Sequence, residues 1–289
     1  MIQFREIEEG VKMKVCKKIL VKILIFFFLA VTLLVTLGPF LWVLFASFQT
    51  NKEILDFTLG FPSGVQIKNY TTAFQLAPIV RYYFNSIFVT FFGVTINLIA
   101  MGMAAYVLSR FQFRGQNLIR LLFSMGLLIP GAALLLPLYT SVSAVGLYDS
   151  MWGLIIVYVG FGIPQSLFII SSYYKTIPKE MEESAYLDGA GFVRTYITII
   201  MPLARPSFAT AGVMQFLLCW NEFQFALTLT TGDRSRTLPI ALYYFKSSFA
   251  SDYGAMFAAI VLVSLPSIIV YIILQKYVVT GMVAGAVKG

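Results

Sequence analysis

The stretch Tyr174–Pro206, YKTIPKEMEESAYLDGAGFVRTYITIIMPLARP, is the longest polar interruption on one side of the chain's apolar segments. Pro178 suits the first position of a helix, because its missing N–H would be unpaired there in any case. Three glutamates follow, where the helix dipole favours negative charge. Gly189 and Gly191 then allow the backbone to turn. The stretch therefore predicts two short helices joined at a hinge.

The first of these helices has two possible roles. It can protrude from a membrane bundle and dock into a cleft on a soluble partner, or it can lie on the lipid surface as an amphipathic helix. Three of the four charged residues from Lys179 to Glu183 are acids, which an anionic leaflet repels. Met181 and Ala185 lie four residues apart and are expected to form an apolar patch on one face. The charge pattern favours docking.

The composition excludes a soluble protein. Of the 289 residues 59% are hydrophobic and 12% are charged, and the mean hydropathy is +0.83. A soluble domain cannot bury that much apolar surface, so an integral membrane protein is expected. The chain has no His, which removes imidazole metal sites. Cys16 and Cys219 lie in different environments and indicate no metal or redox site.

Apolar segments long enough to cross a bilayer of about 30 Å define the expected fold. The fold class is all-α, a polytopic membrane protein with six transmembrane helices and a cytoplasmic loop. The third and fourth segments contain Pro130, Pro137 and Pro164, which indicate either broken helices that line a pathway or ordinary kinks. The expected spans are Ile19–Ser47, Tyr83–Leu108, Leu118–Tyr139, Met151–Tyr173, Ser207–Leu229 and Ala255–Tyr277.

The distribution of basic residues predicts the orientation. With the N-terminus inside, the inner segments hold fifteen Lys and Arg residues and the outer loops hold six. The positive-inside rule then places both termini and the Tyr174–Pro206 loop in the cytoplasm. The net charge of +8 is explained by this asymmetry, so nucleic acid is not expected as a partner.

The N-terminal apolar run Ile19–Ser47 is too long for a signal peptide, so a retained anchor is expected. The predicted organisation has four parts. They are a cytoplasmic arm (1–18), the first span with an extracellular loop (19–82), a five-helix core with the loop at 174–206 (83–277) and a cytoplasmic tail (278–289).

Trp220, Asn221 and Glu222 form a polar cluster towards the outer end of the fifth span. Ring stacking and hydrogen bonding suit a sugar, so these residues are candidates for the substrate pathway. Alternatively, Trp220 anchors the helix at the interface and Glu222 bonds to a neighbouring helix. The outer loop Thr230–Gly254 is either a docking surface for an external binding protein or a solvated connection.

The spacing within the polar loop carries a family resemblance. Glu183-Ser184-Ala185, then Gly189, then Ile199 and Pro202, resembles the cytoplasmic loop of membrane subunits in binding-protein-dependent ABC importers. Ser184 and Met201 depart conservatively from that pattern. The residues expected to couple to the ATPase are Glu182, Glu183, Ser184, Ala185, Asp188, Gly189, Ala190, Ile199 and Pro202.

Flanking segments resemble the sugar branch of these importers, in particular the second membrane subunit of the maltose type. That resemblance implies a C-terminal tail that reaches the ATPase dimer, whereas by composition alone the end would be frayed. The tail residues concerned are Gly281, Ala284, Gly285 and Lys288.

The resemblance also implies the partners. They are a second, different permease subunit, two ATPase subunits, an external or periplasmic solute-binding protein and the lipid of a prokaryotic cytoplasmic membrane. The chain lacks a G-x-x-x-x-G-K-[ST] motif, so ATP and Mg are expected on the ATPase, with no cofactor on this non-catalytic chain. ATPase closure is expected to move a rigid loop helix that continues into the bundle through Pro202. An importer of glycerol-3-phosphate is the main alternative, and an ion-coupled carrier is another.

Overall fold

The computed structural model describes residues 2–56, 61–245 and 252–286, and the side chains of 18–56, 61–245 and 252–275. This part of the chain is helical and contains no strand. The chain divides into two units. One comprises residues 1–71 and 252–261, and the other comprises 72–251 and 262–289.

The first unit is dominated by α1 (Ile2–Ala46), whose apolar part, Lys18–Ala46, is 29 residues long and makes an expected span. Its end packs against the first residues of α13 (Tyr253–Ala286), where Trp42 and Phe257 meet edge to face with ring centres 5.0 Å apart. The short helix α2 (Asn51–Leu55) completes this small core with Ile54.

The helix α2 begins with a capping box. The Thr50 hydroxyl accepts a hydrogen bond from the Glu53 amide, and the Glu53 carboxylate accepts one from the Thr50 amide at 2.7 Å. The second carboxylate oxygen accepts the Ser63 amide at 2.9 Å. A hydrogen bond from the Ser63 side chain foremost, and then those from the Thr50 amide, the Ser63 amide and the Thr50 hydroxyl, lower the pKa of Glu53 to about 2.

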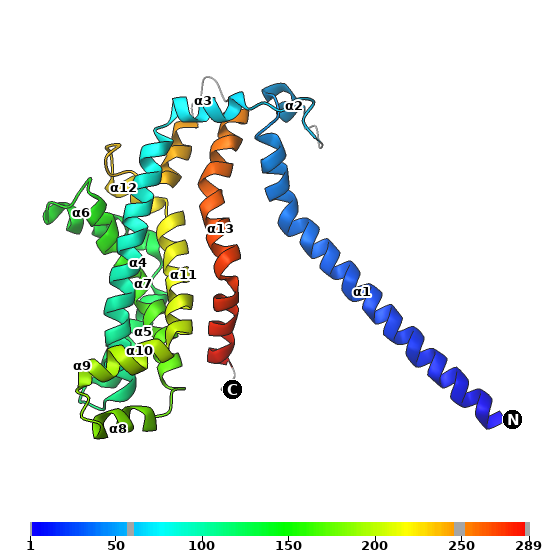
Figure 1. Ribbon diagram of the computed structural model, residues 1–289. Coiled ribbons are helices and arrows are strands. Elements are labelled where there is room, and N and C mark those ends of the chain that lie inside the picture. The colour runs from blue at the N-terminus through cyan, green and yellow to red at the C-terminus, as the bar shows by residue number, and fades with distance from the viewer. Residues whose placement is uncertain (1, 57–60, 246–251, 287–289) are drawn as a thin grey trace. The chain divides into compact units, whose positions relative to one another are not determined.

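The second unit is a helical bundle built on α4 (Ile79–Arg110), α7 (Met151–Tyr174) and α11 (Arg205–Asn221), which lie side by side in Figure 1. Small and polar residues allow these helices to approach closely. A Cβ added to Gly162 of α7 would lie 1.8 Å from the Gln215 side-chain oxygen. The Gln215 amide in turn donates to the Tyr158 carbonyl at 3.0 Å.

Six spans are confirmed if each bent helix pair counts as one. Four helices are individually long and apolar enough to cross a membrane: Lys18–Ala46, Ile79–Arg110, Met151–Tyr174 and Tyr253–Gln275. Two bent pairs, Gln116–Leu128 with Gly131–Ala144 and Phe192–Leu203 with Arg205–Asn221, supply the others. The protein is therefore a polytopic helical membrane protein.

The expected third span is not one straight helix. It consists of α5 (Gln116–Met125), two 3₁₀ turns (Gly126–Leu128 and Gly131–Leu134) and α6 (Leu135–Ala144), and it bends by 99°. Pro130 stands at the break with an extended backbone. Pro164 lies inside α7 without ending it. Among the prolines that indicated a broken helix, Pro130 therefore marks the break in the third span.

The expected fifth span, Ser207–Leu229, is shorter than predicted. Helix α11 ends at Asn221, and α12 (Gln224–Leu229) starts after an extended Glu222. A 3₁₀ segment (Leu238–Phe245) follows and is largely buried. Continuous hydrophobicity across Ser207–Leu229 concealed this break, because Glu222 ends one helix and caps the next.

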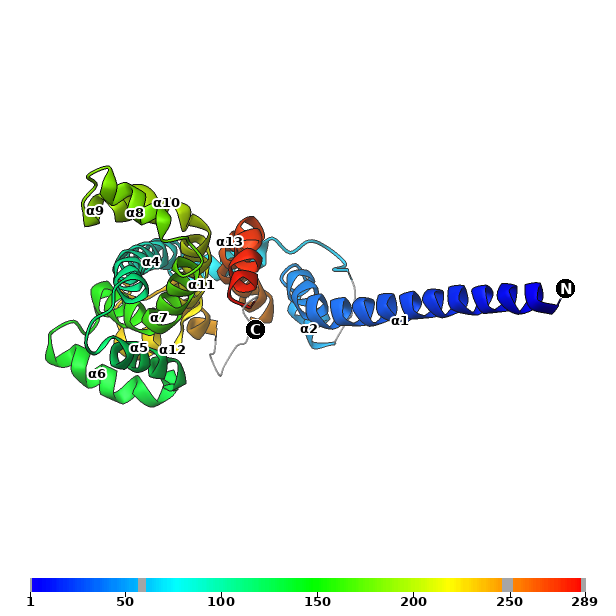
Figure 2. The same cartoon turned by 90° about the horizontal axis from the view of Figure 1, so that it is seen from below.

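The polar loop folds as helices at one edge of the bundle, as the view from below in Figure 2 shows. They are α8 (Glu180–Leu187), α9 (Phe192–Thr195), a π-helical turn (Tyr196–Ile200) and α10 (Met201–Leu203). The first helix begins at Glu180, so the expectation that Pro178 occupies the first helical position is wrong by two residues. Lys179 takes the N-cap position, and its carbonyl accepts the Glu182 and Glu183 amides.

Candidate functional site: the helix α8 and its attachment to the bundle

The helix α8 ends in a Schellman motif. The Gly189 amide donates to the Tyr186 carbonyl at 3.0 Å, and the Ala190 amide donates to the Ala185 carbonyl at 2.9 Å. Gly189 has φ +82°, a left-handed conformation that disfavours a side chain. Gly191 has φ −76° and needs no such freedom. The four-residue spacing from Ala185 to Gly189 thus matches the geometry of this cap.

One face of α8 is held against the bundle by a buried ion pair. Glu182 is 7% exposed, and its Oε1 lies 2.5 Å from the Nε of Arg110, at the end of α4. The Tyr106 hydroxyl donates to the other carboxylate oxygen at 2.9 Å. Arg110 also donates through Nη2 to the Ile177 carbonyl at 2.8 Å, just before α8. Glu182 therefore connects α8 to the last turn of α4.

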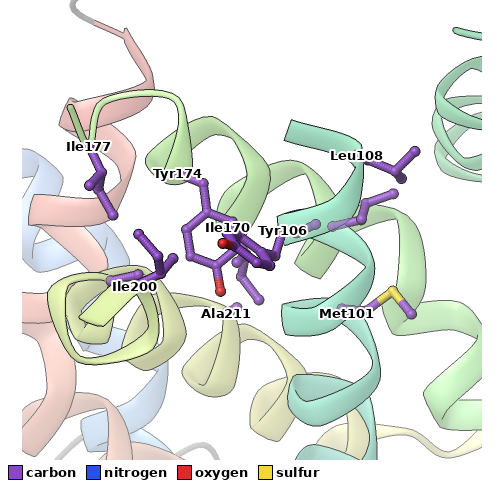
Figure 3. Packing of buried hydrophobic residues seen from close by; sticks show 11 residues of the cluster. Met101, Tyr106, Leu108, Ile170, Tyr174, Ile177, Ile200 and Ala211 are labelled. Atoms are coloured by element: carbon purple, nitrogen blue, oxygen red, sulfur yellow. The ribbon is translucent and has the colours of Figure 1, made fainter. Parts of the chain in front are cut away.

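An aromatic cluster surrounds this ion pair. The Tyr106 ring lies 5.1 Å from Tyr196, 5.3 Å from Phe192 and 6.0 Å from Tyr174, measured between ring centres. Figure 3 shows Tyr106 and Tyr174 turned towards each other, with Ile170 close by. The cluster therefore joins the ends of α4 and α7 to the segment that follows α8.

The opposite face of α8 is exposed. Glu183, Ser184 and Asp188 are on the surface, and Leu187 is 89% exposed. Ser184 uses its hydroxyl within the helix, donating to the Glu180 carbonyl at 2.8 Å. The face thus offers carboxylates around a projecting apolar side chain.

The predicted apolar patch of Met181 and Ala185 does not form. Met181 is 50% exposed, whereas Ala185 is buried against this chain's own bundle. Ala185 belongs to the inward face with Glu182, three residues before it. Close packing at Ala185 is thus satisfied within this chain.

The remaining loop residues lie along the return to the bundle. Ala190, Ile199 and Pro202 are half-buried. The π turn precedes Pro202 and carries a hydrogen bond from the Met201 amide to the Tyr196 carbonyl. A wider turn accommodates the proline, which cannot donate and whose ring clashes with the preceding turn.

A rigid helix that continues into the bundle through Pro202 was expected, but the path through Pro202 is bent and is not one continuous helix. The chain bends by 77° between Phe192–Leu203 and Arg205–Asn221, on either side of Ala204. The bend follows from Pro206, which starts the next helix. The contacts of Glu182 and Tyr106 therefore attach α8 directly to α4, in addition to the bent chain that leads into α11.

The residues proposed for the substrate pathway are engaged within the chain. Trp220 is buried, stacks on Phe216 with ring centres 5.6 Å apart, and donates through Nε1 to the Val263 carbonyl at 3.3 Å. Asn221 is exposed, and its side-chain oxygen accepts the Ser267 hydroxyl at 2.9 Å. These contacts favour a structural role for both residues.

Glu222 is used in the same way. It accepts the Tyr158 hydroxyl at 2.7 Å and the amides of Phe225 and Ala226 at 2.7 and 3.0 Å. The carboxylate therefore caps α12 and bonds α7 to the break after α11. This arrangement corresponds to the structural alternative considered from the sequence.

At the other end of the bundle, Asp149 fastens the turn before α7 to the loop after α12. Its carboxylate accepts the amides of Thr231 and Gly232 at 2.9 and 3.0 Å, and the Ser235 hydroxyl. Burial opposes ionisation, but the bonds from Ser235, Gly232 and Thr231 outweigh it and lower the pKa of Asp149.

Asp233 is placed similarly by α4. It accepts the Tyr82 hydroxyl at 2.6 Å and the Tyr244 hydroxyl at 3.1 Å, and the bond from Tyr82 leads in lowering its pKa. Asn85 donates to the Asp233 and Arg236 carbonyls. The described part of the Thr230–Gly254 loop is therefore docked on the bundle and is not a simple solvated connection.

Sequence reasoning missed Tyr106 and Arg110. The side chain of Arg110 is 6% exposed and ion-paired, although it stands at the end of a predicted span, where a basic residue is common. The two residues lie four apart at the end of a predicted span, so they share a helix face. That spacing was visible in the sequence, but the partner that meets this face was not.

Comparisons with known proteins identify the family of the chain. The sequence profile of the family described as "Binding-protein-dependent transport system inner membrane component" matches residues 96–283. The chain belongs to this family. It is a multi-pass membrane component of a binding-protein-dependent ABC transport system.

Relatives of this inner-membrane component match over most of their length. The putative ABC transporter permease protein ORF2 of Caldicellulosiruptor sp. (strain Rt8B.4) is 39% identical, with 91% of this chain and 96% of the relative covered. The trehalose/maltose transport system permease protein MalG of Thermococcus litoralis is 31% identical, with 94% and 99% covered. A crystal structure of a bacterial ABC transporter involved in import of the acidic polysaccharide alginate matches with TM-score 0.75 and 25% identity, covering 86% of this chain and 93% of that one.

The tail residues expected to contact the ATPase lie at the end of this inner-membrane component. Gly281, Ala284 and Gly285 belong to α13, which continues to Ala286, so the backbone there is helical. Lys288 lies outside the described residues. The role of the tail stays a prediction.

Proposed function

We propose that this chain forms half of the membrane pathway of an ATP-driven importer for a sugar or oligosaccharide. The observation that carries the transport role is α8, with one face fixed to α4 through Glu182 and the other exposed at Glu183 and Leu187. A helix so attached can pass a displacement to the bundle. The sugar class is supported by relatives named for trehalose, maltose and diacetylchitobiose transport.

The partners follow from this role. A second, different permease subunit completes the pathway, two ATPase subunits bind ATP and Mg on the cytoplasmic side, and a solute-binding protein delivers the substrate outside. The asymmetry of Lys and Arg supports cytoplasmic placement of both termini and of α8 in a prokaryotic plasma membrane. This chain itself performs no catalysis, in keeping with its lack of a phosphate-binding loop motif.

In the proposed mechanism, side-chain contacts transmit the displacement of α8 to the bundle. When the ATPase dimer closes, it displaces α8 at its exposed face. Because Glu182, Arg110 and Tyr106 form a buried contact, α4 moves with α8, and the spans shift from inward-open to outward-open. Glu183 contributes a charged contact to the ATPase cleft, and Gly189 holds the turn that follows.

The outer surface suits a binding protein. The docked segment exposes Thr231, Arg234 and Tyr243, while its buried residues hold it in place. Because the outer loop is held in place, a binding protein that docks on it would release its substrate at a fixed position above the membrane pathway.

A glycerol-3-phosphate importer of the same architecture is the alternative, and the sugar-named relatives do not favour it. An ion-coupled carrier would need intramembrane acids free to bind protons or ions. Glu222, the acid at the end of the fifth span, already holds three hydrogen bonds.

Crosslinking tests the coupling role directly. A cysteine at Leu187, which is 89% exposed, is expected to crosslink to a co-expressed ATPase, whereas one at buried Ile170 is not. A deletion strain complemented with this chain is then supplied with labelled maltose, trehalose or glycerol-3-phosphate. Uptake of sugars that requires ATP supports the proposal. Uptake without an ATPase, or of glycerol-3-phosphate alone, contradicts it.

A further inference from the structure

We propose that a groove between α4 and the α10–α11 bend binds an anionic phospholipid, with an acyl chain in the groove and the phosphate on Arg205. The groove is a cavity of about 500 Å³. The segments that form it lie together in Figure 1. Its apolar walls come from α4 and from the segment leading into α11, namely Val94, Leu98, Ile99, Ile197, Met201 and Phe208.

The walls are apolar but not closed. Ile99 and Ile197 are each 53% exposed and Met201 is 38% exposed. Helix α4 is a membrane-spanning candidate, and Phe192–Leu203 is the first half of a bent candidate pair that leads from the polar loop into α11, so the opening lies where this loop enters the membrane and lipid can reach it. An acyl chain fits such a slot, because it needs no hydrogen-bonding partner.

The rim of the groove carries a positive charge. Arg205 lines the cavity and is exposed, and it pairs with no acid in the part of the chain that the structure describes. The acids of the preceding loop lie on or beside α8 instead. A guanidinium binds phosphate oxygens with two parallel hydrogen bonds.

These two features together define the ligand. Inorganic phosphate would use Arg205 but leave the apolar slot empty, and a neutral apolar molecule would leave the guanidinium unpaired. An anionic phospholipid satisfies both, as basic pockets between transmembrane helices do elsewhere.

The position of the groove gives the lipid a structural consequence. Its walls include Ile197 in the π turn and Met201 just after it, and both precede the 77° bend. Tyr196, in the same turn, packs on Tyr106 beside the Glu182 ion pair. A bound lipid therefore supports the segment that returns from α8 to the bundle.

The test measures lipid that copurifies with the assembled importer. The complex is reconstituted in nanodiscs containing phosphatidylglycerol and phosphatidylethanolamine, then delipidated in mild detergent and examined by native mass spectrometry. Arg205→Ala is expected to lower retained phosphatidylglycerol by at least about tenfold, because both charge-assisted hydrogen bonds to the phosphate are lost. Ile99→Trp, which fills the slot, is expected to lower it without removing charge. Arg114→Ala, an exposed cation outside the groove, is expected to retain the wild-type amount.

Wild-type retention in both Arg205→Ala and Ile99→Trp overturns the proposal. So does equal loss in Arg114→Ala, which indicates general charge attraction. Release of the second permease subunit by Ile99→Trp also overturns it, because the groove is then a subunit interface. The readout is lipid mass, so it is independent of whether the importer carries sugar.

Discussion

The Nε of Arg110 lies 2.5 Å from Oε1 of Glu182, which joins the end of α4 to the first turns of α8 inside the protein. Both side chains are nearly inaccessible, at 6% and 9%. An acid in the polar loop thus faces its own bundle, while its neighbour Glu183 faces outward. Two adjacent glutamates therefore differ in environment: Glu182 is bound to α4, and Glu183 is exposed to solvent.

Glu182→Ala should detach α8. It leaves the Arg110 cation buried without its carboxylate, which costs about 3–5 kcal/mol. Amides of α8 should exchange with deuterium roughly 100-fold to several thousand-fold faster, as measured by hydrogen exchange on the importer. Glu183→Ala is the matched control and should change the opening free energy by only about 0.5 kcal/mol. Equal exchange in both variants would show that the ion pair does not hold the helix.

Gly189→Ala should weaken the turn after α8. A side chain at φ +82° costs roughly 1–2 kcal/mol. Asn tolerates this conformation better, so Gly189→Asn should be milder, and bulky replacements should uncouple ATP hydrolysis from uptake. Gly191→Ala is the control, because Gly191 has φ −76° and nothing within 4 Å of an added Cβ. Uptake and ATPase rates measure the outcome, and a Gly191 effect as large as that of Gly189 counts against the turn as the cause.

Gly162→Ala should disturb the bundle, because the added methyl meets the Gln215 side chain at 1.8 Å. Overpacking of this kind costs about 1–3 kcal/mol. Gly160 lies on the opposite face of α7, and a Cβ added there has no atom within 4 Å. Gly160→Ala should therefore be neutral or stabilising. Thermal unfolding of the purified complex compares them. A lower melting temperature for Gly160→Ala than for Gly162→Ala would refute the packing explanation.

The cap of α2 should depend on pH. Hydrogen bonds from Ser63 and Thr50 lower the folded-state pKa of Glu53 from 4.5 to about 2. A depressed carboxyl pKa stabilises the fold above the unfolded value, and this contribution is lost as pH falls from 4.5 towards 2. Protection of the Ser63 and Thr50 amides should decline over that window in the wild type. In Glu53→Gln the decline should be absent, and a decline of the same size there would assign it to other groups.

The lengths of the apolar segments predict most of the helices, whereas the prolines predict only some of the helix breaks. Pro130 stands at the bend of the third span. Pro164 lies inside α7 without ending the helix, because neighbouring helices in a bundle can satisfy the backbone carbonyl that loses its partner at a proline. The end of α11 at Asn221 was not predicted, since the apolar run continues past Glu222 and the Tyr158 partner of this carboxylate is far away in sequence. The glycine at position 189 predicted the turn that follows α8. The Arg110 partner required the tertiary structure.

In the proposed mechanism, α8 moves the bundle through its side-chain contact with α4. The most direct test is the number of ATP molecules hydrolysed per sugar imported in proteoliposomes, for Glu182→Met, Arg110→Met and the double variant. Because an apolar pair can replace a buried ion pair, whereas a single buried charge cannot remain unpaired, each single variant should waste ATP and the double variant should regain much of the coupling. Wild-type coupling in both single variants would show that the ion pair does not transmit the movement of α8 to α4.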